Sequence, residues 1–196
     1  MTKRLYLLDA WLKHFETRVT GYRRDGAGVW LSLEESAFYP EGGGQPWDTG
    51  KLESVRGRLS VLSVQEDEWG EVWHRVDARN EAELPPIGER LRGEIDFARR
   101  FDHMQQHTGE HILANCVWRL TGGFTHGLHI GQEVSSIDIT LPDGAMRLTQ
   151  ETLDEIETLA NERVAEDAGI VCRFPKEEEL ADLPLRKDPT VREHVR

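Results

Sequence analysis

The sequence predicts an α+β fold in two parts, a small β-barrel-like domain over residues 1–95 and an α+β domain over residues 96–196. In the first part, short runs of β-branched, aromatic and alternating apolar residues are separated by turn dipeptides. The second part opens with a long segment of helical character, followed by strand-like runs and another helical segment. A proline-containing stretch at residues 84–88 precedes the last strand of the first part and places the boundary near residue 95.

Strands are expected in the first part wherever apolar side chains recur between turns. Asp25-Gly26 and Trp69-Gly70 are typical of hairpin turns. The expected strands cover residues 4–8, 16–22, 28–33, 58–64, 71–76 and 90–95. Several short strands at such spacing favour a small barrel.

The second part is expected to begin with a helix over residues 96–120 that ends before Gly122-Gly123. One stripe of this helix is mainly apolar and is expected to face the core: Phe97, Phe101, Met104, Thr108 and Ile112. The following elements are expected to be strands at 124–130 and 134–141, a helix capped by Thr149 that runs to residue 168, a strand at 170–174 and a short acidic helix.

The composition excludes several classes of protein. No run of about 18 apolar residues occurs, so no membrane span is expected. The only cysteines, Cys116 and Cys172, do not form a disulfide framework, and the N-terminus does not resemble a signal peptide, so a reducing cytoplasm is expected. The net charge of −12, from 24 basic and 36 acidic residues, argues against a general nucleic-acid binder.

A metal site is suggested by His107 and His111, which share one face of the expected helix because 3.6 residues make a turn. Two imidazoles at this spacing can reach one metal ion. His103 lies too far round the helix to join them easily and is expected to be a surface histidine or a partner of a ligand. A pair of histidines alone is weak evidence, because ordinary helix surfaces also carry such pairs.

A second, rarer string covers residues 38–50. Its three successive glycines, Gly42, Gly43 and Gly44, allow backbone conformations closed to other residues and a close approach to another chain or a ligand. Gln45 carries the polar side chain in this loop that is expected to reach a substrate. A tight turn between two strands remains the simpler structural interpretation of the string.

The segment from His107 to His111 also matches the His-x-x-Glu-His signature of inverted zinc peptidases. In that interpretation Glu110 is the general base and the two histidines bind zinc. The string at residues 38–50 is not explained by that class of enzyme.

Both strings, in this order and together with residues 134–138, 147–151 and 183–187, resemble the editing module of alanyl-tRNA synthetases and the free-standing alanyl-tRNA editing proteins of AlaX type. The resemblance implies hydrolysis of the ester in tRNA(Ala) that is mischarged with serine or glycine. It also implies zinc held by His107 and His111, and a substrate cleft beside Gly42, Gly43, Gly44 and Gln45. Glu110 and Gln132 are the candidate catalytic side chains, with Gln132 expected on a strand near the helix, where a solvent-facing role is an equal alternative.

The family completes its zinc site with a Cys-x-x-x-His pair that these 196 residues do not contain. We therefore expect a C-terminally truncated editing domain that holds zinc weakly and is inactive in this form. A non-catalytic tRNA-binding relative without a complete zinc site is the alternative. A monomer is expected. The resemblance to a synthetase also implies ATP binding.

A tRNA partner would have to meet a local basic patch on this acidic chain. The candidate residues for such a patch are Arg90, Arg92, Arg99, Arg100, Arg186, Lys187 and Arg192, although solvated surface charges are the simpler interpretation.

Overall fold

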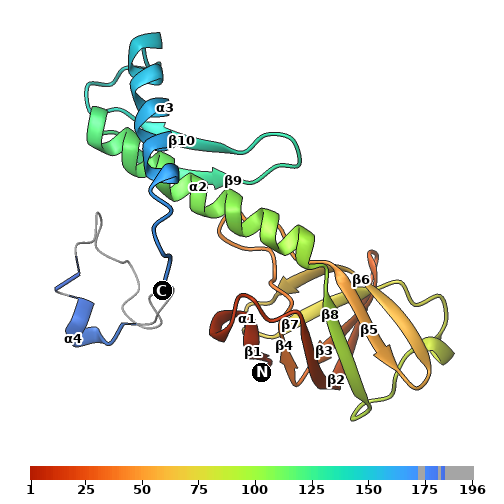
Figure 1. Ribbon diagram of the computed structural model, residues 1–196. Coiled ribbons are helices and arrows are strands. Elements are labelled where there is room, and N and C mark those ends of the chain that lie inside the picture. Colours follow the sequence, from red (N-terminus) through yellow and green to blue (C-terminus); the bar gives the residue numbers. More distant parts are fainter. Residues whose placement is uncertain (172–174, 181, 184–196) are drawn as a thin grey trace.

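The computed structural model describes residues 1–171, 175–180 and 182–183, which form two lobes joined by a long helix (Figure 1). The first lobe is a closed barrel, as the sequence predicts, with strands in the order β2-β3-β7-β6-β5-β8. Its strands are β2 (His14–Asp25), β3 (Gly28–Leu33), β5 (Gly50–Ser54), β6 (Gly57–Glu66), β7 (Val72–Val76) and β8 (Arg90–Ile95). Every neighbouring pair in the barrel is antiparallel.

Alternation of buried and exposed residues builds the barrel core. In β2, Phe15, Thr17 and Val19 point inward while their neighbours are exposed, because successive side chains of a strand face opposite sides. They meet fully buried residues such as Leu31 and Leu33. β5 was not expected from the sequence, because Leu52 is the only large apolar residue among its five positions.

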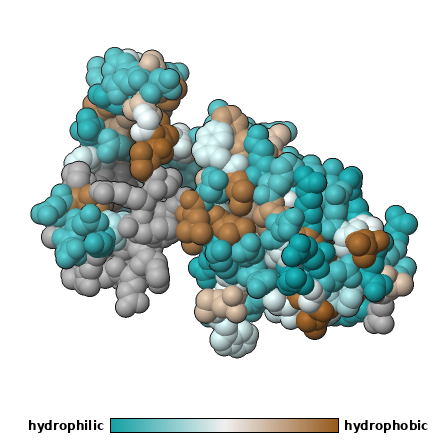
Figure 2. Space-filling model, turned by 60° about the horizontal axis from the view of Figure 1, so that its bottom comes forward, coloured by the Kyte–Doolittle hydropathy of each residue, from teal (hydrophilic) through white to brown (hydrophobic). Residues whose placement is uncertain are grey.

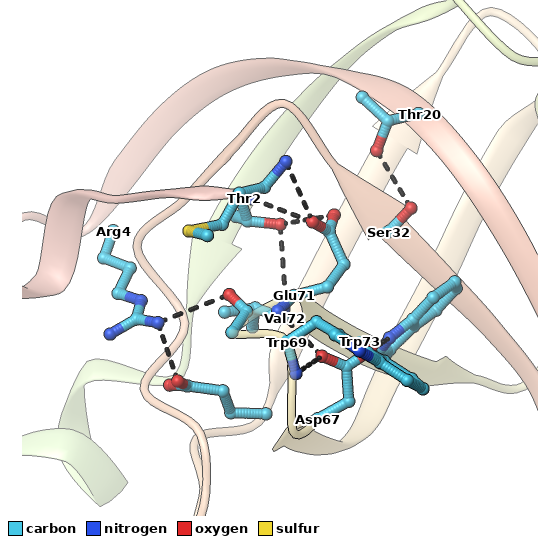
Figure 3. A network of polar contacts seen from close by, with 12 residues as sticks. Thr2, Arg4, Thr20, Ser32, Asp67, Trp69, Glu71, Val72 and Trp73 are labelled. Atoms are coloured by element: carbon cyan, nitrogen blue, oxygen red, sulfur yellow. Dashed lines mark hydrogen bonds and ion pairs between the residues drawn. The ribbon is translucent and has the colours of Figure 1, made fainter.

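The N-terminus differs from the strand expected at residues 4–8. β1 (Lys3–Arg4) is short and pairs in parallel with β4 (Glu35–Ser36), and the chain then turns into α1 (Leu5–Leu8). Polar contacts fasten this end to the barrel (Figure 3): the Thr2 hydroxyl donates to Glu71 Oε1 at 2.9 Å, and Arg4 Nη2 donates to Glu66 Oε1 at 2.6 Å. Residues 5–8 therefore form a helical turn rather than a strand, and Tyr6 is the residue of this turn that is buried.

The long helix α2 (Phe97–Thr121) follows the last strand of the barrel after one intervening residue, close to the expected limits. Asp96 caps it by accepting a hydrogen bond from the Arg99 amide at 3.2 Å, while its own amide donates to Thr49 O at 2.8 Å. At the other end Gly122 adopts a left-handed conformation with φ of 69°, which ends the helix. The cap therefore fixes the start of α2 to the barrel.

The buried face of α2 is not the expected apolar stripe. The residues that face inward are Arg100, His103, Ala114, Cys116 and Val117, whereas Phe101 is 38% exposed. The first half of α2 packs on a polar loop of the barrel lobe rather than on an apolar layer. The periodicity argument assumes an apolar partner surface, and it fails here because that partner is polar.

The second lobe is built on the other half of α2. β9 (Phe124–His129) and β10 (Ser136–Thr140) form an antiparallel hairpin, and α3 (Gln150–Ala165) packs on α2 (Figure 1). Cys116, Val117 and Ile156 are the buried centre of this lobe. Thr149 caps α3 as expected, by accepting from the Thr152 amide at 3.1 Å.

After α3 the structure departs from expectation. α3 ends at Ala165 rather than at residue 168, and the expected strand at 170–174 lies partly outside the described residues, as does Cys172. The short acidic helix is α4 (Glu177–Leu180), and a 3-10 turn, Glu81–Glu83, precedes β8. No helix in the described part of the chain combines the length and the apolar character needed to cross a membrane.

Figure 2 shows a largely hydrophilic face with a hydrophobic area near its centre.

Candidate functional site

The glycine-rich loop forms a closed turn that is docked on the second lobe. Gly42 and Gln45 exchange backbone hydrogen bonds of 3.1 and 3.0 Å. Gly44 has φ of 80°, and a Cβ there would lie 2.1 Å from Leu128 O, so only glycine permits this approach to β9. The Ile130 amide donates to Gly44 O at 3.2 Å. The loop of the barrel lobe thus lies directly against the end of β9.

The base of this loop is locked by Asp48 and Arg100. Asp48 is fully buried and Arg100 is 3% exposed, and Arg100 Nε donates to both carboxylate oxygens of Asp48 at 3.0 Å. Arg100 also donates to Ala37 O at 2.6 Å and to Ala10 O at 3.0 Å. The suggested role of Arg100 in a tRNA-binding patch is therefore wrong, since its guanidinium is buried and hydrogen-bonded inside the protein.

Sequence reasoning did not single out this pair. The available signal was Asp48, one of the two acidic residues in the string at residues 38–50. Arg100 could not be distinguished from its neighbour Arg99, since the apolar stripe assigned both to the surface.

Gln45 and His107 join the two strings on which the sequence interpretation depends. Gln45 is 6% exposed, and its Oε1 accepts a hydrogen bond from His107 Nδ1 at 2.7 Å. This bond fixes the tautomer of His107 that carries the proton on Nδ1, so Nε2 carries the lone pair. Gln45, which was expected to reach a substrate, thus contacts a candidate metal ligand.

The His107 and His111 rings lie one helical turn apart and nearly parallel, with centroids separated by 5.0 Å and planes inclined by 18°. The His111 side chain is 72% exposed, and its Nδ1 lies 3.5 Å from Glu110 Oε2. One ring is thus backed by the glycine-rich loop, and the other faces solvent.

This arrangement fits two ligands of a zinc site. A metal-binding imidazole is usually oriented by a polar group on its other nitrogen, as Gln45 orients His107. Zinc takes four ligands, and the part of the chain that the structure describes contains no group of three or more His, Cys, Asp or Glu side chains able to hold a metal. The described residues therefore supply the two histidines and leave the remaining ligands to other groups.

Two other candidate side chains lie on α2 or on the loop beside it. Glu110 has a side chain only 9% exposed. Gln132 is exposed on the loop between β9 and β10, so its expected placement on a strand is wrong. That loop lies beside α2, because Ser135 Oγ donates to Gln106 Oε1 at 3.1 Å.

His103, which was expected near the surface or beside a ligand, is 5% exposed, and its Nδ1 has no hydrogen-bond partner. Burial, followed by the positive charge of Arg99, lowers the pKa of His103, so the ring is neutral in this setting. It belongs to the buried seam between α2 and the barrel lobe.

Comparison with known proteins agrees with this layout. Residues 12–99, which include the whole loop, match the family model for class II (A) tRNA synthetases. An alanyl-tRNA editing protein AlaX-M of Methanosarcina mazei is 35% identical over 190 residues, which are 93% of this chain and 73% of that protein. The chain belongs to the alanyl-tRNA editing protein family.

Other members of this family and of the synthetases show the same relationship. The AlaX-M protein of Saccharolobus solfataricus is 36% identical over 92% of this chain and 72% of its own length. The alanine–tRNA ligase of Thermococcus kodakarensis is 38% identical over 88% of this chain, but that match covers 18% of the ligase. A region like this chain therefore forms a modest part of a much larger synthetase and most of a free-standing editing protein.

Proposed function

We propose that this chain hydrolyses the ester bond of tRNA(Ala) mischarged with serine or glycine. The observation that carries the proposal is the hydrogen bond between Gln45 and His107, because it brings the glycine-rich string and the histidine pair to one place. Membership of the alanyl-tRNA editing family supplies the class of reaction.

In this proposal His107 and His111 hold zinc, and Gln45 positions His107. When bound, zinc supplies a Lewis acid and a means of activating water. Glu110 Oε2 lies 3.5 Å from His111 Nδ1 and places a carboxylate beside the second ring.

The exposed loop that carries Gln132 borders the same helix and is the candidate for contact with the aminoacyl group. A Cβ on Gly42 or Gly43 would meet no other atom within 4 Å, so a substrate can approach the backbone of the loop at these two positions.

The selection logic favours a separate editing site. Serine differs from alanine by one hydroxyl, and an apolar pocket rejects such an addition poorly. A site that hydrogen-bonds the hydroxyl can discriminate against alanine far more strongly. Hydrolysis of an ester needs no nucleotide, so the proposal assigns no ATP site to these residues. It treats the chain as a monomer that acts in the cytoplasm.

Deacylation assays test this function directly. Ser-tRNA(Ala), Gly-tRNA(Ala) and Ala-tRNA(Ala) are incubated with the chain, with and without added zinc, and the remaining ester is measured. Faster loss of the serine and glycine esters than of the alanine ester is expected. Equal rates on all three esters would contradict the proposal, as would cleavage of peptides with the esters intact, which is the outcome for an inverted-motif zinc peptidase. Binding of tRNA(Ala) without hydrolysis under any metal condition would indicate the non-catalytic relative.

A further inference from the structure

An exposed cluster of three aromatic rings lies where α2 leaves the barrel, and no residue of the candidate site uses it. Trp11 lies 5.7 Å from both Phe97 and Phe101, measured between ring centroids, and the two phenylalanines stack at 6.2 Å. Trp11 is 59% exposed and Phe101 is 38% exposed. We call these three residues the aromatic cluster. Adjoining apolar rings left in solvent mark a surface that a ligand covers.

The aromatic cluster is held rigidly. The carbonyl of Ala10 accepts from Arg100 Nη1 at 3.0 Å, and Leu12 packs against the barrel core. The carbonyl of Lys13 accepts from the Ile95 amide at 2.9 Å. Trp11 therefore sits between anchored neighbours and presents a pre-organised ring, which lowers the entropic cost of binding a planar ligand.

Positive charge adjoins the rings in an otherwise acidic chain. Lys13 Nζ lies 4.3 Å from the centroid of Phe97. From Phe97 and Lys13 a groove of about 630 Å³ extends along the barrel, and Lys51 and His14 also line it. Two acidic residues, Glu94 and Asp96, also line it, so Lys13 and Lys51 are the two positions in the groove at which a phosphate can be bound. Aromatic rings with cationic side chains beside them are the recurring device for binding single-stranded nucleic acid.

The aromatic cluster and the histidine pair lie on one stripe of α2. At 100° per residue, Phe97, Phe101 and His111 fall within roughly 80° of one another around the helix axis. From Phe101 to His111 the helix rises roughly 15 Å, which is the length of about four stacked nucleotides. Met104 and Thr108 lie between them and are partly exposed. An unpaired strand can therefore follow this stripe from the rings to the histidines.

We propose that the aromatic cluster binds the single-stranded 3′ end of the tRNA by stacking its bases, with phosphates entering the groove at Lys13 and Lys51. This inference rests on the proposed function, which places the terminal ester at His107 and His111. It also accounts for the exposure of Phe101, which the periodicity assigned to a protein core and which is 38% exposed.

Binding of an uncharged RNA tests the inference without using hydrolysis. The probes are a fluorescent hairpin with a four-nucleotide single-stranded 3′ end and the same hairpin with a blunt end. Trp11→Ala and Phe101→Ala should each weaken binding of the overhang hairpin about tenfold and leave the blunt hairpin unchanged, since stacking contributes about 1–3 kcal/mol per base. Trp69→Ala is the matched control, because Trp69 is 73% exposed on the turn between β6 and β7, away from the aromatic cluster.

Salt dependence separates stacking from charge. Lys13→Gln should lower the salt slope of overhang binding by about 0.7, whereas Trp11→Ala should leave the slope unchanged. Wild-type binding by Trp11→Ala, equal losses on both hairpins, or no preference of the wild type for the overhang would each overturn the inference. A lower molecular mass for Trp11→Ala than for the wild type in solution would also overturn it, by showing that a second copy of the chain covers the rings. If overhang binding behaves as expected while Ser-tRNA(Ala) is not hydrolysed, the proposed function fails and the stacking site stands.

Discussion

Gln45 Oε1 and His107 Nδ1 are 2.7 Å apart although 62 residues separate them in the chain. Gln45 belongs to a loop of the barrel lobe, and His107 belongs to the helix that leads into the second lobe. Their hydrogen bond is buried on the glutamine side, so it is shielded from competition by water. This contact makes one site of the glycine-rich loop and the histidine pair. Taken separately, the loop could be a simple turn and the pair a surface feature.

Replacement of Gln45 by alanine should therefore weaken zinc binding and deacylation together, by about 10–100-fold. The physical reason is that His107 loses the acceptor that fixes its ring orientation and its tautomer. Gln45→Glu keeps an acceptor at that position and should recover part of the affinity. Zinc affinity is measured by competition with a fluorescent chelator, with Gln105→Ala on the exposed face of α2 as the control. Unchanged affinity in Gln45→Ala would show that Gln45 does not position His107.

Replacement of either ligand histidine should have a different effect from replacement of His103. His107→Ala and His111→Ala each remove half of the described ligands and should abolish measurable zinc binding. His111→Ala should do so with little loss of stability, because the His111 side chain is 72% exposed. His103→Ala should leave zinc affinity within about threefold and lower the free energy of unfolding, since it opens a cavity at a buried position. Zinc titration and urea unfolding of the three variants separate these effects. Zinc loss in His103→Ala equal to that in His111→Ala would contradict the assignment.

The sequence predicts the strands in which apolar residues recur regularly and the helix whose two ends carry capping residues. β3 and β8 have the expected limits, and the ends of α2 lie within one residue of expectation, because β-branched residues, Asp96 and Gly122 mark them locally. β5 was missed because its short sequence offers one large apolar residue to the core. Strand pairing, rather than local composition, makes it a strand.

The candidate site was predictable in its residues and not in its contacts. His107, His111 and the glycine-rich loop stand out by spacing and composition, whereas the contact of Gln45 with His107 depends on how two lobes meet. The inward face of α2 was assigned wrongly for the same reason. Arg100 lies on that face because its guanidinium pairs with the buried carboxylate of Asp48 in the barrel lobe. Long-range polar pairing leaves no periodic signal in a sequence.

Removal of one member of the Asp48–Arg100 pair should destabilise the protein by about 3–5 kcal/mol, because the other charge is left buried and unpaired. Asp48→Ala is the direct variant, and urea unfolding measures its free energy. The double variant Asp48→Ala/Arg100→Met should be more stable than Asp48→Ala alone, since it removes the stranded cation. Equal stability of Asp48→Ala and the wild type would show that the pair contributes no net stability.

His74 should make the barrel sensitive to mild acid. The ring is fully buried, its Nδ1 donates to Leu31 O at 3.1 Å, and its Nε2 accepts from Ser36 Oγ at 2.7 Å. Burial lowers the pKa of His74 from 6.5 to about 4. Between these values the unfolded chain binds a proton that the folded chain does not, so stability is complete above pH 6.5 and falls as the pH decreases towards 4.

The loss through His74 should reach roughly 3 kcal/mol at pH 4, from the difference between the two pKa values. Urea unfolding at pH 7 and at pH 4.5 measures it against His74→Gln, which keeps polar atoms and does not titrate. The variant should be less stable than the wild type at pH 7 and should lose less stability on acidification. Parallel losses in both proteins would mean that other groups dominate the acid response.

Zinc binding by this chain should be weak, because the described residues supply two ligands, His107 and His111. Complete four-ligand zinc sites in small domains bind with about 10–16 kcal/mol, and a site with two protein ligands leaves half of the coordination shell to water. Dialysis without chelator should therefore remove the metal, and without added zinc the chain should show no appreciable editing. Elemental analysis after dialysis measures this. A tightly held, equimolar zinc would show that side chains outside the described residues, such as Cys172 or His194, complete the site, and the assignment of the ligands would have to be extended to them.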